Sequence, residues 1–197
     1  MNSKQILRLT TTALLFGLTL LLGLTPLGFI TVNPTIKITL MCLPVVIGTV
    51  VYGLGTGLLL ALVFGATSCY VAITQPDALV LAMQSAPFAL YFTIFVPRLL
   101  IPLAVHGMRR LSHRWPAPVS FGFCAAVGSL ANTAFFLSGA WLLGSGAIAS
   151  AWEISRTAVA LLFGTAALTN GLPEVLACVL ICVPVLLALQ KAKFINR

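Results

Sequence analysis

The chain has 197 residues, of which 60% are hydrophobic and only 7% are charged. A soluble domain carries about 25% charged residues, and a soluble globule with so few charges would expose large apolar patches and aggregate. The net charge of +8 does not indicate nucleic-acid binding, because the basic residues sit at the ends of apolar runs rather than among aromatic residues on one face. The composition therefore predicts a protein that is embedded in lipid.

The first half of the chain predicts three spanning helices. An apolar run over 6–24 follows Lys4 and Arg8 and lacks a small-x-small cleavage site, so we expect a retained helix rather than a signal peptide. Residues 25–35, with two prolines, predict a loop or a broken stretch that lines a cavity. We expect a short helix over 37–52, then a tight turn at closely spaced glycines and a helix that ends near Thr74.

The second half predicts three more helices. A loop over 75–87 precedes a helix over 88–109, and a basic loop over 110–118 leads to a helix over 119–143. The segment 144–172 is predicted to be a long connection, amphipathic over 152–168, and the last helix covers 173–189. Since a span needs about 20 residues, the length leaves room for six or seven spans with short loops. We expect an all-α polytopic bundle of six transmembrane helices that forms a single substrate-binding domain over 1–197.

The charges divide between the two sides of such a bundle. All three acidic residues fall on one side: Asp77, Glu153 and Glu174. The basic residues at the helix ends fall on the other side: Lys4, Arg8, Arg109, Arg110, Arg114, Lys191, Lys193 and Arg197. This positive-inside pattern predicts that both termini are cytoplasmic. A seventh span over 152–168 would place the C-terminal lysines outside, so we do not predict one.

Small residues recur every four positions on two predicted helices. Gly57, Ala61 and Gly65 begin a ridge that favours close packing inside the bundle. On the first helix, Ala13 and Gly17 have the same spacing. This pair could pack internally or dock a partner membrane protein.

Arg98 is the most informative residue, because it lies near the middle of a predicted span. A charge at that depth costs about 2.5–3.5 kcal/mol on insertion scales, and it is too far from either interface to snorkel. Two partners could compensate for it: Glu174, which begins the last predicted helix, or an anionic group on a bound substrate.

Other polar residues extend this candidate site. Asn132 and Thr133 lie near mid-depth of the fifth predicted helix. An amide at that depth either forms hydrogen bonds between helices or binds a polar ligand. Opposite helix directions bring Asn132 to about the depth of Arg98. Lys37 either anchors the outer interface or lines the entrance to a site, and His106 is interpreted as an interface residue.

The residue set does not favour an enzyme. Metal chemistry or phosphotransfer needs clustered acids or histidines, and the sequence has no Walker motif for ATP. The cysteines lie in apolar stretches without histidine company, which is typical of small buried residues. We therefore predict no catalytic residue, no metal site and no cofactor. The absence of intramembrane acids also argues against a proton-coupled carrier.

The sequence resembles the substrate-binding S component of energy-coupling factor (ECF) vitamin transporters. The fragments that carry the resemblance are ITLM at 38–41, LPVVIG at 43–48, FGATS at 64–68, VPRLL at 96–100, GSLANT at 128–133 and NGLPE at 170–174. The family implies a six-helix bundle that binds a vitamin near the outer face and works with a membrane scaffold (T) subunit and two ATPase (A) subunits.

The resemblance also assigns roles to individual residues. The last fragment brings Asn170 and Glu174 to the expected substrate site, together with Arg98, Asn132, Thr133 and Lys37. The family's helix 1 docking motif maps to Ala13 and Gly17, with glycine in place of the usual second alanine. Because glycine is also small, docking on the scaffold is still expected.

The fragments look most like the pantothenate-type branch of the family. An arginine for a carboxylate and an asparagine for an amide or hydroxyl suit pantothenate, while cobalamin and folate stay open as substrates. Two other classes also stay open, a structural membrane protein without a ligand and a stand-alone facilitator. The resemblance implies a multi-pass protein of the bacterial plasma membrane.

Overall fold

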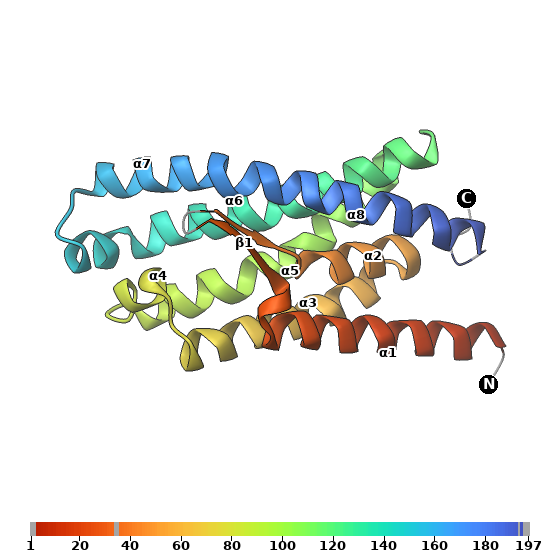
Figure 1. Cartoon of the computed structure of the whole chain (residues 1–197), viewed down its shortest axis with the longest axis horizontal. Coiled ribbons are helices and arrows are strands. Elements are labelled where there is room, and N and C mark those ends of the chain that lie inside the picture. The colour runs from red at the N-terminus through yellow and green to blue at the C-terminus, as the bar shows by residue number, and fades with distance from the viewer. Residues whose placement is uncertain (1–2, 34–35, 193, 195–197) are drawn as a thin grey trace.

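The computed structural model describes residues 3–33, 36–192 and 194. It consists of helices that run along a common long axis, with one small β-hairpin on the flank (Figure 1). The elements in chain order are α1 (Ser3–Leu24), the 3₁₀ turn η1 (Pro26–Gly28), β1 (Phe29–Asn33), β2 (Ile36–Thr39), α2 (Cys42–Tyr52), α3 (Leu54–Thr74), α4 (Ala78–Ala82), α5 (Pro87–Leu111), α6 (Ala117–Ala151), α7 (Arg156–Ala166), the π-helical segment η2 (Ala167–Gly171) and α8 (Leu172–Lys191).

Five helices within the described residues are long and apolar enough to cross a membrane. They are α1, α3, α5, α6 and the continuous helix from Arg156 to Lys191, which joins α7, η2 and α8. The apolar helix α2 is shorter than these five. The multi-pass membrane character that the composition predicts is therefore present in the helices themselves.

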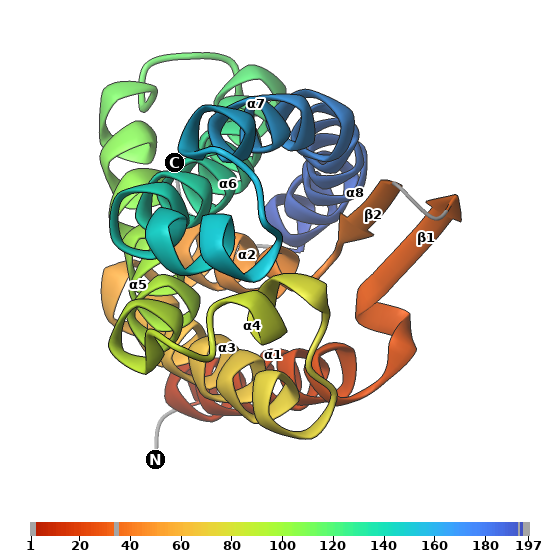
Figure 2. The ribbon, with the colours of Figure 1, turned by 90° about the vertical axis from the view of Figure 1, so that its left-hand side faces the viewer.

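Both ends of the chain lie at the same end of the bundle (Figure 1). Seen from the opposite end, α1 and α3 form one side, α7 and α8 form the other, and α5 and α6 lie between them (Figure 2). The most extensive helix contact joins α5 to α6, and α6 in turn packs on α8. The hairpin lies on the flank between α1 and α8, and β2 contacts α8.

The buried apolar side chains form two separate cores along the bundle axis. One core joins α2 to the parts of α5, α6 and α8 near the termini, with Ile101, Phe121 and Cys178 among its members. The other core joins α4 and α7 to the far parts of α5 and α6, with Leu90 and Ile148 among its members. Between the two cores, α5 carries Arg98, α6 carries Asn132 and α8 begins with Glu174 in its first turn. This gap is where a ligand site can form.

Close helix contacts depend on the small residues that the sequence indicates. A Cβ atom on Gly65 would lie 2.8 Å from the Phe95 ring, and a Cβ atom on Gly57 would lie 2.8 Å from Pro102. Since both neighbours belong to α5, the ridge on α3 packs inside the bundle, as predicted. By contrast, Ala13 and Gly17 lie on the exposed face of α1, and no atom would lie within 4 Å of a Gly17 Cβ.

The predicted helix over 37–52 was wrong in its first residues. Residues Ile36–Thr39 form β2, which pairs antiparallel with β1 in the register Phe29↔Thr39 and Ile30↔Ile38, and the helix begins at Cys42. The alternation of β-branched residues in this segment favours an extended strand. The all-α prediction holds for the bundle and overlooked this hairpin.

The predicted connection over 144–172 was also wrong. Helix α6 continues to Ala151, and after a turn in which Glu153 has a φ of 53° the chain is helical again from Arg156. The prediction excluded a separate span over 152–168 because it would place the C-terminal lysines outside, and it did not consider one helix that continues through Gly164, Gly171 and Pro173. In lipid an interrupted helix persists, because its backbone polar groups have no water to bond with. Glu174 consequently lies inside a continuous helix rather than at the start of one.

Candidate functional site

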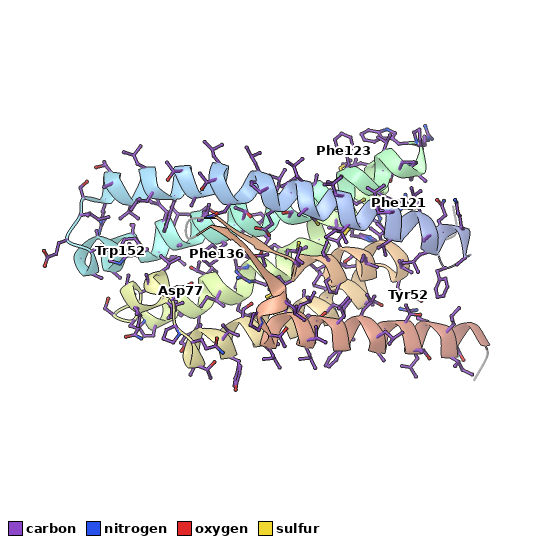
Figure 3. All side chains as sticks on the ribbon, viewed as in Figure 1. Tyr52, Asp77, Phe121, Phe123, Phe136 and Trp152 are labelled. Atoms are coloured by element: carbon purple, nitrogen blue, oxygen red, sulfur yellow. The ribbon has the colours of Figure 1, made fainter. Side chains whose placement is uncertain are left out.

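A cavity of about 330 Å³ lies between the two cores. Figure 3 places two of its lining residues, Asp77 and Phe136, in the half of the bundle away from both termini. The structure brings together five predicted site residues in its wall: Arg98, Asn132, Thr133, Asn170 and Glu174. The sixth, Lys37, belongs to β2, but its side chain lies outside the described residues.

The proline that precedes Arg98 leaves a backbone carbonyl free to bind the Arg98 guanidinium. Pro97 lies inside α5 and has no N–H, so the carbonyl of Thr93, four residues earlier, lacks its helical donor. The Arg98 Nη1 atom donates to this carbonyl oxygen at 3.4 Å. A Pro-Arg pair in a spanning helix thus creates an acceptor for its own guanidinium, and the cost of the buried charge is partly offset.

Two aromatic rings also contact the Arg98 guanidinium. Its Cζ atom lies 5.3 Å from the centre of the Phe64 ring on α3 and 5.1 Å from that of the Phe136 ring on α6. Contacts at this range are attractive cation–π interactions, and they strengthen when water is excluded. Sequence reasoning missed both rings. The available signal was the position of Phe136, one helical turn after Asn132.

Arg98 and Glu174 line the same cavity without forming an ion pair. Within the described chain, no acidic oxygen lies within 4.0 Å of the guanidinium nitrogens. Glu174 is only 6% exposed, and its side chain forms a hydrogen bond with that of Asn132, while Arg98 acts on it as a nearby charge without forming an ion pair. Among the described residues Arg98 and Glu174 therefore do not pair directly, and a substrate anion as the partner of Arg98 stays a prediction.

Three buried polar atoms in the cavity wall have no hydrogen-bond partner among the described residues: Arg98 Nε, Asn132 Oδ1 and Glu174 Oε1. An unsatisfied buried polar atom costs about 1–3 kcal/mol, and more if the group is charged. One of the three is a cationic donor and the other two are acceptors. A ligand that satisfies all of them must carry an anionic or acceptor group together with N–H or O–H donors.

The π-helical segment η2, which precedes α8, forms part of the same cavity wall. Asn170 lies in the π-helical segment η2, and single π turns within α-helices are frequent at functional sites. Gly171 follows it, and a Cβ atom there would lie 3.3 Å from the Thr133 methyl group. Without that Cβ atom, η2 can lie close to α6.

The rim of the cavity includes polar groups that sequence reasoning did not single out. Ser68 comes from α3, Gln75 directly follows α3, and Asp77 caps α4 by accepting from the Val80 N–H at 2.9 Å. Gln75 and Asp77 lie in the α3–α4 loop, within the loop over 75–87 that the sequence predicts. The residues themselves carried no distinctive motif.

Comparison with known proteins places this site in context. Residues 7–186 match the family described as "ECF transporter, substrate-specific component". The pantothenic acid transporter PanT of Lactococcus lactis subsp. cremoris (strain MG1363) is 27% identical over 168 residues, which cover 80% of each chain. The family match covers the residues of both cores and the whole described cavity wall from Gly23 to Glu174.

Proposed function

This chain belongs to the family of ECF transporter substrate-specific components, and on that premise we propose that it is the pantothenate-binding subunit of an ATP-driven vitamin uptake transporter. The observation that carries the proposal is the Arg98 guanidinium, which lines a cavity without an acidic partner. A ligand carboxylate supplies the missing charge in a desolvated site, where an ionic hydrogen bond is strongest.

Pantothenate fits the remaining unpaired atoms. Its amide N–H and its hydroxyls are donors, and the two unpartnered acceptors are Asn132 Oδ1 and Glu174 Oε1. In this pose the carboxylate lies at Arg98, and the amide and hydroxyl end lies toward Asn132 and Glu174. Thr133, Asn170 and Lys37 complete the proposed site, with Lys37 near its entrance. Similarity to the Lactococcus pantothenic acid transporter supports the same substrate.

Cavity size bears on the alternative vitamins. A cavity of about 330 Å³ lies at the small end of the usual range for ligand pockets. Cobalamin is several times larger than pantothenate and would not be enclosed. Folate stays the alternative to test, because it also carries carboxylates that Arg98 would bind.

Energy for transport comes from partner subunits in this proposal, since the chain has no ATP-binding motif. The partners are a membrane scaffold (T) subunit and two ATPase (A) subunits. Ala13 and Gly17 are the proposed scaffold-docking residues, and their exposure on α1 supports that role. Docking there joins substrate capture to the energising module.

The proposed topology has six transmembrane helices, with α2 as a short sixth span and both termini in the cytoplasm of a bacterial cell. Arg8, Arg110 and Lys191 lie at the end of the bundle that holds the termini, which supports this orientation by the positive-inside rule. The cavity then lies in the outer half of the membrane, where it captures substrate from outside.

A panel of labelled vitamins measured by equilibrium binding to the purified protein tests the substrate. We expect saturable binding of pantothenate, and no binding of cobalamin. Preferential binding of folate would reassign the substrate, and a lack of binding by every vitamin would favour a structural protein. Uptake by liposomes that contain this chain alone, without ATP and partners, would instead indicate a facilitator.

A further inference from the structure

The end of the bundle near the termini carries a concentration of positive charge without acidic neighbours. Arg8, the α5–α6 turn and Lys191 all lie at this end (Figure 1). None of the three acids of the chain is there, because Asp77 and Glu174 line the cavity and Glu153 lies in the α6–α7 turn. Residues 110–116, which comprise the end of α5 and the turn to α6 and are together named the α5–α6 turn, hold the densest group of these cations.

One arginine beside the turn is committed to internal contacts. Arg109 Nη1 donates to Ser120 Oγ at 2.9 Å, and its Cζ atom lies 5.2 Å from the centre of the Phe121 ring. Ser120 Oγ lies 2.7 Å from Ser112 Oγ, which donates to the Met108 carbonyl oxygen at 2.8 Å. Both serines are fully buried. This chain of hydrogen bonds ties the end of α5 to the start of α6 and fixes the shape of the turn.

The other basic residues of the turn are exposed. Arg110, His113 and Arg114 all point away from the core, and the His113 ring Nδ1 lies 3.0 Å from the Arg110 carbonyl oxygen. No ion pair or hydrogen bond of the Arg110 or Arg114 guanidinium occurs within the described residues. Two guanidinium groups are thus presented by a rigid turn with no protein anion to bind.

Exposed apolar side chains lie among these cations. Leu111 is 76% exposed and Trp115 is 43% exposed, and the Trp115 and Phe123 rings meet in an edge-to-face arrangement with their centroids 5.2 Å apart. Tryptophan is enriched at membrane interfaces, because its ring suits the boundary between headgroups and acyl chains. A soluble acidic partner would account for the arginines but not for the apolar side chains beside them.

We propose that the α5–α6 turn is a binding site for anionic phospholipid headgroups. Arg110 and Arg114 bind the lipid phosphate, for which the planar guanidinium is well suited, while Leu111 and Trp115 lie at the level where the acyl chains begin. The site is independent of the vitamin cavity and of the proposed substrate. Its occupant is a lipid of the surrounding leaflet, selected by negative charge.

Quenching of Trp115 fluorescence by brominated lipids tests the site in nanodiscs. Trp141→Phe and Trp152→Phe leave Trp115 as the reporter. At equal mole fraction in a phosphatidylcholine bilayer, brominated phosphatidylglycerol should quench Trp115 more strongly than brominated phosphatidylcholine. Arg110→Gln combined with Arg114→Gln should lower the relative affinity for phosphatidylglycerol by about tenfold. The preference should also fall at high salt.

Two controls separate this site from general electrostatics. Arg156→Gln removes an exposed positive charge at the start of α7, on the far side of the bundle, and should leave the preference at Trp115 unchanged. The double variant Arg110→Lys with Arg114→Lys keeps both charges, so it should retain most of the preference for phosphatidylglycerol that the double glutamine variant loses. Equal quenching by both lipids would overturn the proposal and point to a protein partner for the basic turn. A preference that survives the double glutamine variant, or that is lost in Arg156→Gln, would overturn it as well.

Discussion

The Arg98 guanidinium donates to the backbone oxygen of Thr93, with 3.4 Å between the Nη1 and oxygen atoms. This acceptor exists because Pro97 leaves the carbonyl without its helical N–H. Pro97→Ala should return that N–H and let it compete for the Thr93 oxygen. We therefore expect pantothenate affinity to fall by about three- to tenfold, while the thermal stability of the protein stays the same or rises, because the helix gains a hydrogen bond.

Isothermal titration and thermal unfolding in detergent measure these two effects of Pro97→Ala. Pro184→Ala is the matched control, since Pro184 also lies inside a helix and is not part of the cavity wall. Unchanged affinity in Pro97→Ala would show that the Thr93 carbonyl does not position the guanidinium.

Removal of the guanidinium itself should have a larger effect. Arg98→Ala leaves the ligand carboxylate without a partner in a desolvated site, so binding should weaken at least tenfold. Arg98→Lys should recover part of the loss, because it keeps the charge but not the planar fork. Arg156→Ala controls for the loss of a positive charge elsewhere. Wild-type affinity in Arg98→Ala would remove this residue from the site.

The separation of Arg98 from Glu174 predicts a weak energetic coupling between them in the free protein. Glu174→Gln keeps the shape of the side chain and removes an ionic acceptor, so pantothenate binding should weaken about tenfold. A double-mutant cycle with Arg98→Ala, measured by thermal unfolding without ligand, should give an interaction energy below about 0.5 kcal/mol. A coupling of several kcal/mol would mean that the two residues form a structural ion pair instead.

The sequence revealed the polar part of the cavity because polar side chains in an apolar span are costly. Arg98 and Asn132 stood out for that reason, and opposite helix directions were enough to place them at one depth. Glu174 was instead predicted at the start of the last helix, as a possible partner of Arg98. Phe64 and Phe136 did not stand out, since aromatic residues are common throughout such spans. Their role depends on where three helices meet, which composition does not encode.

The last third of the chain was assigned as a connection before a helix over 173–189, and a separate seventh span was excluded by the distribution of charges between the two sides. Glycine and proline normally end helices in water, but from Arg156 to Lys191 a single helix continues through Gly164, Gly171 and Pro173. The π-helical segment η2 absorbs part of this irregularity and carries Asn170 into the cavity wall. The β1–β2 hairpin was missed because its strands are short and lie in a segment that prolines mark as a loop.

The proposed orientation predicts which residues a membrane-impermeant maleimide reaches in intact cells. Asp77→Cys should be labelled from outside, while Arg114→Cys should be labelled only after the membrane is opened. Of the native cysteines, Cys42, Cys124, Cys178 and Cys182 are buried in the structure, and the unmodified chain provides the background for Cys69. Labelling with the opposite sidedness would invert the topology and place the cavity on the cytoplasmic side.

The exposed small residues of α1 predict a docking defect that leaves substrate capture intact. Ala13→Trp or Gly17→Trp should abolish copurification with the scaffold and ATPase subunits, because an indole would prevent close approach of a partner helix. Pantothenate binding by the solitary chain should be unchanged, since neither residue lines the cavity. Leu14→Trp is the control, because residue 14 is 68% exposed but points about 100° away from residue 13 around the helix. If complexes with Gly17→Trp assemble and transport normally, the scaffold docks on another face.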